Sequence, residues 1–315
     1  MPRVIRMRRV WIVMAFLFAF GALEPASAQK RGTRQEPLRV LLIPADGGTE
    51  DGTKADFKPL FDAITRTSGL YFDVQVGQSY AAVIEGMCAG LADIAWFGPV
   101  SFIEARNRGC AELLAVEERD GSSTYYAALF VSASSDIRAV EDLQGHSLAL
   151  GSSHSASSFA YPIAMIAQAG IDPLFDLGAL RLTGSHANSL MALKSGQVDA
   201  AGASLVSFER AVNQAGLDAS AFRILAKSDP IPNPPIAMNP GLSVAMKSAL
   251  RDAIAGVHAA PGVNQDAIRG YGGKRVDRYD TRVDETVFTD AAAAIAFIDD
   301  DFKAAVLRKA GAAQN

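Results

Sequence analysis

The stretch that decides the fold is SLALGSSHSASS, residues 147–158, which joins an apolar run to a run with helical periodicity. Residues 148–150 have the composition of a buried strand, and residues 159–169 that of a helix. The serines between them fall where the first amide N–H groups of a helix lack partners within that helix. Such groups, with hydroxyl donors beside them, attract an anion without a buried countercharge. The alternative is a serine-rich turn that carries an ordinary helix N-cap.

Strand-like and helix-like segments alternate on both sides of this stretch. Before it, the sequence predicts strands at 38–44, 71–76, 93–97, 113–116 and 125–131, and helices at 57–67, 80–89 and 99–109. After it, the sequence predicts strands at 180–183, 198–202 and 222–226, and helices at 187–195, 205–215, 243–255 and 290–308. This alternation predicts an α/β protein with parallel sheets.

Two successive runs of this kind predict two lobes. We expect a discontinuous first lobe of 38–131 plus 227–310 and a second lobe of 132–226. The strands near 125–131 and 222–226 would then form a two-strand hinge. Ligands of open α/β sheets bind beyond the carboxyl ends of the strands, so the cleft between the lobes is the predicted site.

The first residues have the pattern of an export signal. Four arginines between residues 3 and 9 precede an uncharged run at 10–23, and Ala26-Ser27-Ala28 is a small-residue cleavage sequence. The uncharged run is shorter than the about 20 residues of a membrane-spanning helix. We therefore expect a signal peptide over 1–28, cleaved after Ala28, a disordered leader over 29–37 and a periplasmic location. The alternative is an uncleaved N-terminal anchor.

Charge and cysteine content narrow the function further. The whole chain has a formal net charge of −4, and loss of the four arginines and one glutamate of residues 1–28 makes it −7. A net acidic protein is a poor partner for nucleic acid, so none is expected. In an oxidising compartment Cys88 and Cys110 can pair, and we predict a disulfide between them. Two buried free thiols are the alternative.

Several short motifs in a fixed order carry a family resemblance. They are YAAVIEGM at 80–87, ADIAWFGP at 92–99, YYA at 125–127, DLQG at 142–145, SAS at 155–157, SH at 185–186 and SDPIPN at 228–233. Over roughly residues 38–260 the chain resembles the substrate-binding proteins of phosphonate, phosphite and phosphate ABC importers. The resemblance implies the two-lobed periplasmic-binding-protein fold, with two α/β domains around the ligand cleft. It also implies a monomer that delivers its ligand to membrane permease subunits.

The resemblance implies specific ligand-binding residues. In the family a Ser-Thr-Ser run at a helix start binds the phosphorus oxyanion, and Ser155, Ala156 and Ser157 match it, with alanine replacing the threonine. The family also supplies a histidine from the second lobe, which His186 matches. Of the two tyrosines that come from the first lobe, one is matched by Tyr80 and the other by Tyr125 or its neighbour Tyr126.

The residue chemistry agrees with these roles, because hydroxyl and imidazole groups can satisfy the many acceptor sites of a tetrahedral oxyanion. Each residue also has a structural alternative. His186 can be a core or capping residue, and Tyr80 can begin a helix with its ring in the core. Trp96 and Phe97 end a strand and would line the cleft or pack in the core. His154, inside the serine-rich run, would face either the ligand or solvent.

The resemblance and the residues also bear on the ligand. Relatives that take aminoalkyl phosphonates hold the ammonium group with acidic side chains, whereas the matching segments here are Val206-Ser207 and Asn233-Pro234. Glu209 and Asp229 lie nearby in sequence and leave this point open. We expect phosphate, phosphite or a simple alkyl phosphonate. A periplasmic sensor, or a binder of another small anion or an organic solute on the same fold, is the alternative.

An exported hydrolase is the third hypothesis, and the sequence argues against it. Residues 151–155 lack the second glycine of a nucleophile elbow. The chain has no Gly-rich phosphate loop with a lysine and no His/carboxylate cluster with metal-ligand spacing. We therefore expect no catalysis, no cofactor and no metal.

Overall fold

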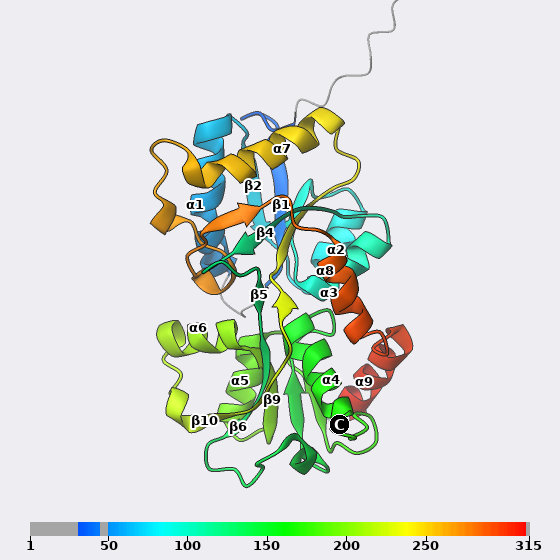
Figure 1. The fold of residues 1–315 in the computed structure, drawn as a ribbon. Helices are drawn as coiled ribbons and strands as arrows, with labels where there is room; N and C mark the ends of the chain where they lie inside the picture. The colour runs from blue at the N-terminus through cyan, green and yellow to red at the C-terminus, as the bar shows by residue number, and fades with distance from the viewer. Residues whose placement is uncertain (1–30, 45–49, 313–315) are drawn as a thin grey trace, which may run out of the picture. The chain divides into compact units, whose positions relative to one another are not determined.

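The computed structural model describes residues 31–44 and 50–312 (Figure 1). The predicted signal peptide, 1–28, lies outside these residues. The described part of the expected leader, 31–37, is held on the protein rather than disordered. The amide of Gly32 donates to Glu36 O at 2.8 Å, and Arg31 Nη1 pairs with Asp93 Oδ2 at 3.1 Å. No described helix is both long and apolar enough to cross a membrane.

The first of two large sheets has six strands, in the order β13-β4-β12-β3-β1-β2. In chain order these are β1 (Leu38–Leu42), β2 (Phe72–Val76), β3 (Ile94–Trp96), β4 (Glu112–Glu118), β12 (Pro235–Met238) and β13 (Arg278–Asp280). β1 runs parallel to β2 and β3, as the alternation predicts. β12 and β13 pair antiparallel, so the predicted parallel pairing holds for β1, β2 and β3 and the sheet as a whole is mixed. These two strands return from later parts of the chain and are not linked to their neighbours by a helical crossover.

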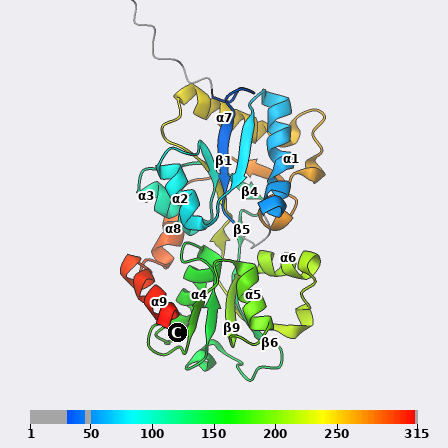
Figure 2. The same ribbon diagram turned by 180° about the vertical axis from the view of Figure 1, so that it is seen from behind.

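Helices cover both faces of this sheet (Figure 2). They are α1 (Glu50–Ser68), α2 (Tyr80–Cys88), α3 (Pro99–Asn107), α7 (Val244–Gly256) and α8 (Thr286–Ala294). Side chains of α1 such as Phe57, Leu60 and Ile64 are at most 1% exposed, because their helical spacing places them on one face against the sheet. The predicted disulfide is confirmed: Cys88 at the end of α2 is bonded to Cys110, two residues before β4.

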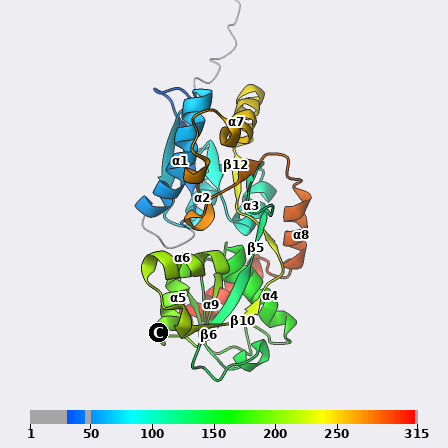
Figure 3. The ribbon, with the colours of Figure 1, turned by 60° about the vertical axis from the view of Figure 1, so that its left-hand side comes forward.

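The second sheet has five strands, in the order β10-β6-β9-β7-β8. They are β6 (Ala127–Ser132), β7 (Leu148–Leu150), β8 (Leu180–Leu182), β9 (Ala200–Ser204) and β10 (Phe222–Lys227). β7 pairs parallel with β8 and β9, whereas β6 pairs antiparallel with β9 and β10. α5 (His186–Lys194) and α6 (Leu205–Ala215) pack on one side of it, and α4 (Tyr161–Gln168) on the other (Figure 3).

The chain crosses between the two sheets through two paired segments and again, near its end, between residues 294 and 300. β5 (Thr124–Tyr125) pairs antiparallel with β11 (Ile231–Pro232), next to the pairing of β6 with β10. The deciding stretch, 147–158, leaves β7 and turns into helix at its predicted place. The helix opens with a π-helical turn, Ala156–Ala160, before α4. Helix starts and loops thus lie at the end of each sheet that faces the other sheet.

The predicted single helix at 290–308 is wrong. The chain forms α8 and then α9 (Asp300–Ala312), with Asp299 Oδ1 accepting from Phe302 N at 2.8 Å as a local start signal for α9. α9 packs against β8 of the second sheet, where Lys309 Nζ donates to Leu174 O and Leu177 O at 2.7 Å each. The predicted domain limits stay a prediction, and α9 lies with the second sheet although they assign it to the first lobe.

Candidate functional site

A small cavity between the two sheets brings together six of the seven predicted ligand-binding residues. Its lining consists of Ile43, Tyr80, Gly98, Tyr125, Ser155, Ala156, Ser157, His186, Pro234 and Tyr271. Seven of them lie after β1, β3 or β7 or at the starts of α2, α3 and α5. Tyr125 ends β5 (Thr124–Tyr125), Pro234 lies between β11 and β12, and Tyr271 lies in the loop before β13. Neither a carboxylate nor a lysine or arginine is among these lining residues. The cavity therefore offers uncharged donors only.

The helix start after β7 presents unused backbone donors. Ser155 is the N-cap, and its Oγ accepts from Ser158 N at 3.2 Å. Within the described residues, the amides of Ala156 and Ser157 have no hydrogen-bond acceptor. Gly151 allows the turn to close tightly, because a Cβ there would lie 2.2 Å from Ser158 Oγ. An anion in the cavity would meet two N–H groups at the positive end of a helix.

His186 is buried as a neutral donor. It is 1% exposed, and its Nδ1 accepts from the backbone N–H of Ser204 at 3.0 Å. A nitrogen that accepts carries no proton, so the proton of the neutral ring is on Nε2. Burial lowers the pKa of His186 to about 3. At neutral pH the ring therefore offers one Nε2–H donor and no charge.

The tyrosines enter from the other side. Tyr80 opens α2 beside the N-cap Ser79 and is 3% exposed, and Tyr125 ends β5 and is 6% exposed. Tyr126 does not line the cavity, and Lys227 Nζ lies 3.8 Å from the centre of its ring. Successive side chains of an extended chain point to opposite sides, so only one of the two neighbours faces the cavity. Of the two alternatives, that residue is Tyr125.

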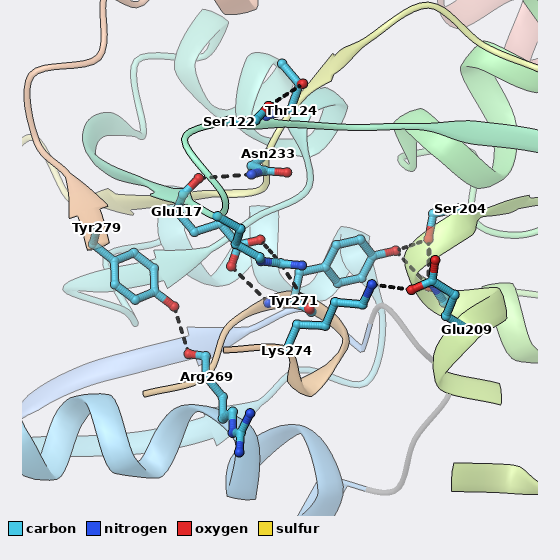
Figure 4. A network of polar contacts seen from close by, with 12 residues as sticks. Glu117, Ser122, Thr124, Ser204, Glu209, Asn233, Arg269, Tyr271, Lys274 and Tyr279 are labelled. Carbon is cyan, nitrogen blue, oxygen red and sulfur yellow. Dashed lines mark hydrogen bonds and ion pairs between the residues drawn. The ribbon is translucent and has the colours of Figure 1, made fainter. Parts of the chain in front are cut away.

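Sequence reasoning missed Tyr271. Its hydroxyl lies 2.7 Å from both Ser204 Oγ and Ser207 Oγ and 3.4 Å from His186 Nε2. It enters from the loop that precedes β13 and reaches across to α6 (Figure 4). The available signal was the segment Gly270-Tyr271-Gly272-Gly273, because an aromatic residue among glycines marks a loop with special backbone angles. Gly272 and Gly273 have φ of +71° and +67°.

The remaining candidates lie outside this cavity. His154 Nδ1 lies 2.6 Å from Glu104 Oε2, and Lys303 Nζ lies 2.5 Å from Glu104 Oε1. The three line a larger cavity, beside the ion pair of Arg108 with Glu85. Lys303 and Arg108 are thus already paired with the carboxylates of Glu104 and Glu85. This pairing makes the larger cavity a poor site for an anion. Trp96 and Phe97 are at most 2% exposed and do not line this cavity, so they take the core alternative, with the ring centre of Trp96 5.9 Å from that of Tyr271.

The lobe surfaces beside the cavity are closed against each other. Arg210 Nη1 of α6 pairs with Asp56 Oδ2 of α1 at 2.5 Å, and Lys274 pairs with Glu209. Gly272 touches α6 so closely that a Cβ on it would lie 2.4 Å from Val206 Cγ1. Glu209 is therefore neutralised by a lysine and does not line the cavity, and neither does Asp229. The carboxylates that the sequence left open are not at the site.

Comparison with known proteins gives a consistent result. The family model for the periplasmic substrate-binding protein of phosphonate ABC transporters matches residues 48–282. The phosphate-import protein PhnD of Mycolicibacterium smegmatis is 27% identical over 190 residues, 57% of this chain and 58% of that relative. The phosphonates-binding periplasmic protein of Escherichia coli is 26% identical over 235 residues, 73% of this chain and 68% of that relative.

A solved structure shares the fold. The binding protein component of an ABC phosphonate transporter from Pseudomonas aeruginosa superposes with a TM-score of 0.70 at 21% identity. The match covers 87% of this chain and 98% of that one. The two-lobed α/β architecture predicted from the sequence is confirmed.

Proposed function

Because the chain belongs to the family of periplasmic substrate-binding proteins of phosphonate ABC transporters, we propose that it captures a phosphorus oxyanion in the cavity between its sheets. The ligand class is phosphonate, phosphite or phosphate. One relative is named for phosphate import and another for phosphonate binding, which supports including both ligands in this class.

One observation carries the proposal: residues with hydrogen-bond donors from both lobes line one cavity, and none of them is charged. The amides of Ala156 and Ser157, the Ser157 hydroxyl and the Nε2–H of His186 come from the second lobe. Tyr80 and Tyr125 come from the first. A phosphorus oxyanion has enough acceptor oxygens for all of them, and charge-assisted hydrogen bonds of this kind are strong. Ala156 in place of the family's threonine still supplies its backbone N–H.

The proposed cycle uses the crossing segments as a hinge. The anion binds to the separated lobes, the lobes close around it, and the closed protein delivers it to the permease subunits of an ABC importer. The paired strands between the sheets, together with the ion pair of Arg210 with Asp56, support a closed arrangement that can separate as rigid halves. We further propose export, cleavage after Ala28 and action as a monomer, without catalysis or nucleic-acid binding.

A thermal-shift screen tests this function. The protein is unfolded and refolded to remove any retained solute, then heated with phosphate, phosphite, methylphosphonate or sulfate. We expect at least one phosphorus oxyanion to raise the melting temperature progressively with concentration, as ligand binding to the folded state requires. The variant His186→Gln should show a smaller shift. No shift with any of the phosphorus oxyanions would refute the proposal.

A further inference from the structure

Tyr271 occupies the part of the cleft that leads from the proposed anion site toward α6. Its side chain is 2% exposed, and its ring lies edge-on to Tyr125 with the ring centres 5.5 Å apart. The ring centre of Trp96 is 5.9 Å away on another side. The phenol oxygen lies within hydrogen-bond distance of two serines of the opposite lobe (Figure 4). A side chain from the first lobe thus fills the space between the cavity and the serines at the start of α6.

The backbone around Tyr271 holds the ring in place. Its N–H donates to Glu117 Oε2 at 3.0 Å, and its carbonyl accepts from Arg119 Nη2 at 3.0 Å. Glu117 is fully buried and pairs with Arg119. Gly270 lies so close to this carboxylate that a Cβ would be 1.9 Å from Glu117 Oε2. Because the loop is anchored on the buried Glu117 carboxylate and the partly buried Arg119 guanidinium, moving the ring would disturb the loop as well as the phenol contacts.

The Tyr271 phenol also engages the polar groups at the start of α6. Ser204 is the N-cap of α6, and its Oγ accepts from Ser207 N at 2.9 Å. Both serine hydroxyls contact the Tyr271 hydroxyl. A substituent pointing toward α6 would have to expel the ring and leave these hydroxyls to find new partners. Buried polar groups that lose their partners are costly. Steric exclusion and lost hydrogen bonds therefore act in the same direction.

We infer that Tyr271 limits the ligand to compact tetrahedral phosphorus oxyanions, in which the group on phosphorus is a hydrogen, a hydroxyl or a methyl. This inference rests on the proposed function, since it concerns the size of the anion held in the same cavity. Tyr271 acts as a specificity-determining residue: it sets how far a substituent can extend beyond the phosphorus atom. The oxyanion itself is left to the donors from residues 155–157 and His186.

Calorimetric titration with methyl-, ethyl- and propylphosphonate tests the inference, because the series varies length without adding charge. The wild-type protein should bind methylphosphonate at least 100-fold more tightly than propylphosphonate. Tyr271→Ala opens the space and should reduce this ratio at least tenfold. Tyr271→Phe keeps the ring and should preserve the preference, which separates the size of the ring from its hydroxyl.

The outcomes separate the inference from the proposed function. If the wild-type protein binds methyl- and propylphosphonate equally, the inference is overturned and the proposed function stands. This comparison uses the wild-type protein alone, so it does not depend on whether a variant folds. An unchanged ratio in a folded Tyr271→Ala protein also overturns it. If the wild-type protein binds no phosphonate, phosphite or phosphate, both are overturned.

Discussion

The backbone amide of Ser204 lies 3.0 Å from Nδ1 of His186, and this contact determines which ring nitrogen carries the proton. Ser204 ends β9 and caps α6, whereas His186 begins α5, so the contact joins two neighbouring βα connections of the second sheet. The imidazole is thereby presented as a neutral Nε2–H donor.

Acid should destabilise the protein partly through His186. Its pKa is about 3 in the folded state and about 6.5 when unfolded, so the unfolded chain takes up a proton below pH 6.5 that the folded chain does not. Lowering the pH from 7.5 to 5 should reduce the free energy of unfolding by roughly 2 kcal/mol through this residue. Urea unfolding of the wild type and of His186→Gln at both pH values measures it. Equal pH dependence in the two proteins would disprove this assignment.

Ser157→Ala should weaken binding of the phosphorus oxyanion. A hydrogen bond to a charged group contributes about 1.5–3 kcal/mol, which corresponds to roughly a 10- to 150-fold loss of affinity in a titration. Ser158→Ala is the matched control, because the Ser158 hydroxyl is buried, does not line the cavity and has no partner among the described residues. If both variants lose affinity equally, the serine-rich turn does not act through Ser157.

Gly272→Ala should hinder closure of the lobes. The residue has φ of +71°, and a Cβ would lie 2.4 Å from Val206 Cγ1 on the other side. We expect at least tenfold weaker ligand binding, measured by calorimetry. Gly216→Ala is the control: its φ is +65°, but a Cβ would touch nothing within 4 Å, so it should lower stability and leave affinity unchanged. Equal affinity loss in both variants would contradict the contact's role.

The disulfide should contribute to stability but not to binding. Cys88 and Cys110 are 22 residues apart in sequence, and closing such a loop stabilises by about 3 kcal/mol in the chain-entropy model. The double variant Cys88→Ala/Cys110→Ala should therefore unfold at a lower urea concentration and bind the ligand as before. Its bond lies between α2 and β4, away from the cavity lining. An unchanged urea midpoint would contradict the expected stabilisation.

Much of the fold follows from local sequence patterns. The βα alternation, the helix start after β7 and the cysteine pair all depend on periodicity, capping residues or compartment chemistry, and each agrees with the structure. The break between α8 and α9 was missed because the apolar spacing continues through it. Only the capping role of Asp299 and the contact of α9 with β8 separate the two helices.

The residues of the candidate site could be predicted from the sequence less completely than the fold. The residues of the serine-rich turn could be predicted to line the cavity because they lie in one short stretch that also starts a helix. The choice between Tyr125 and Tyr126 needed the strand's orientation. Tyr271 lies far from the other site residues in sequence, and its role depends on a loop anchored by Glu117 and on two serines of the opposite lobe. No local sequence pattern predicts a contact between residues so far apart in the chain.

A crystal structure of the refolded protein grown with methylphosphonate tests the proposed anion site most directly. We expect the phosphorus group in the cavity, with its oxygens at hydrogen-bond distance from the amides of Ala156 and Ser157 and from His186 Nε2. A methylphosphonate bound elsewhere, with these three donors turned to protein groups or solvent, would contradict it.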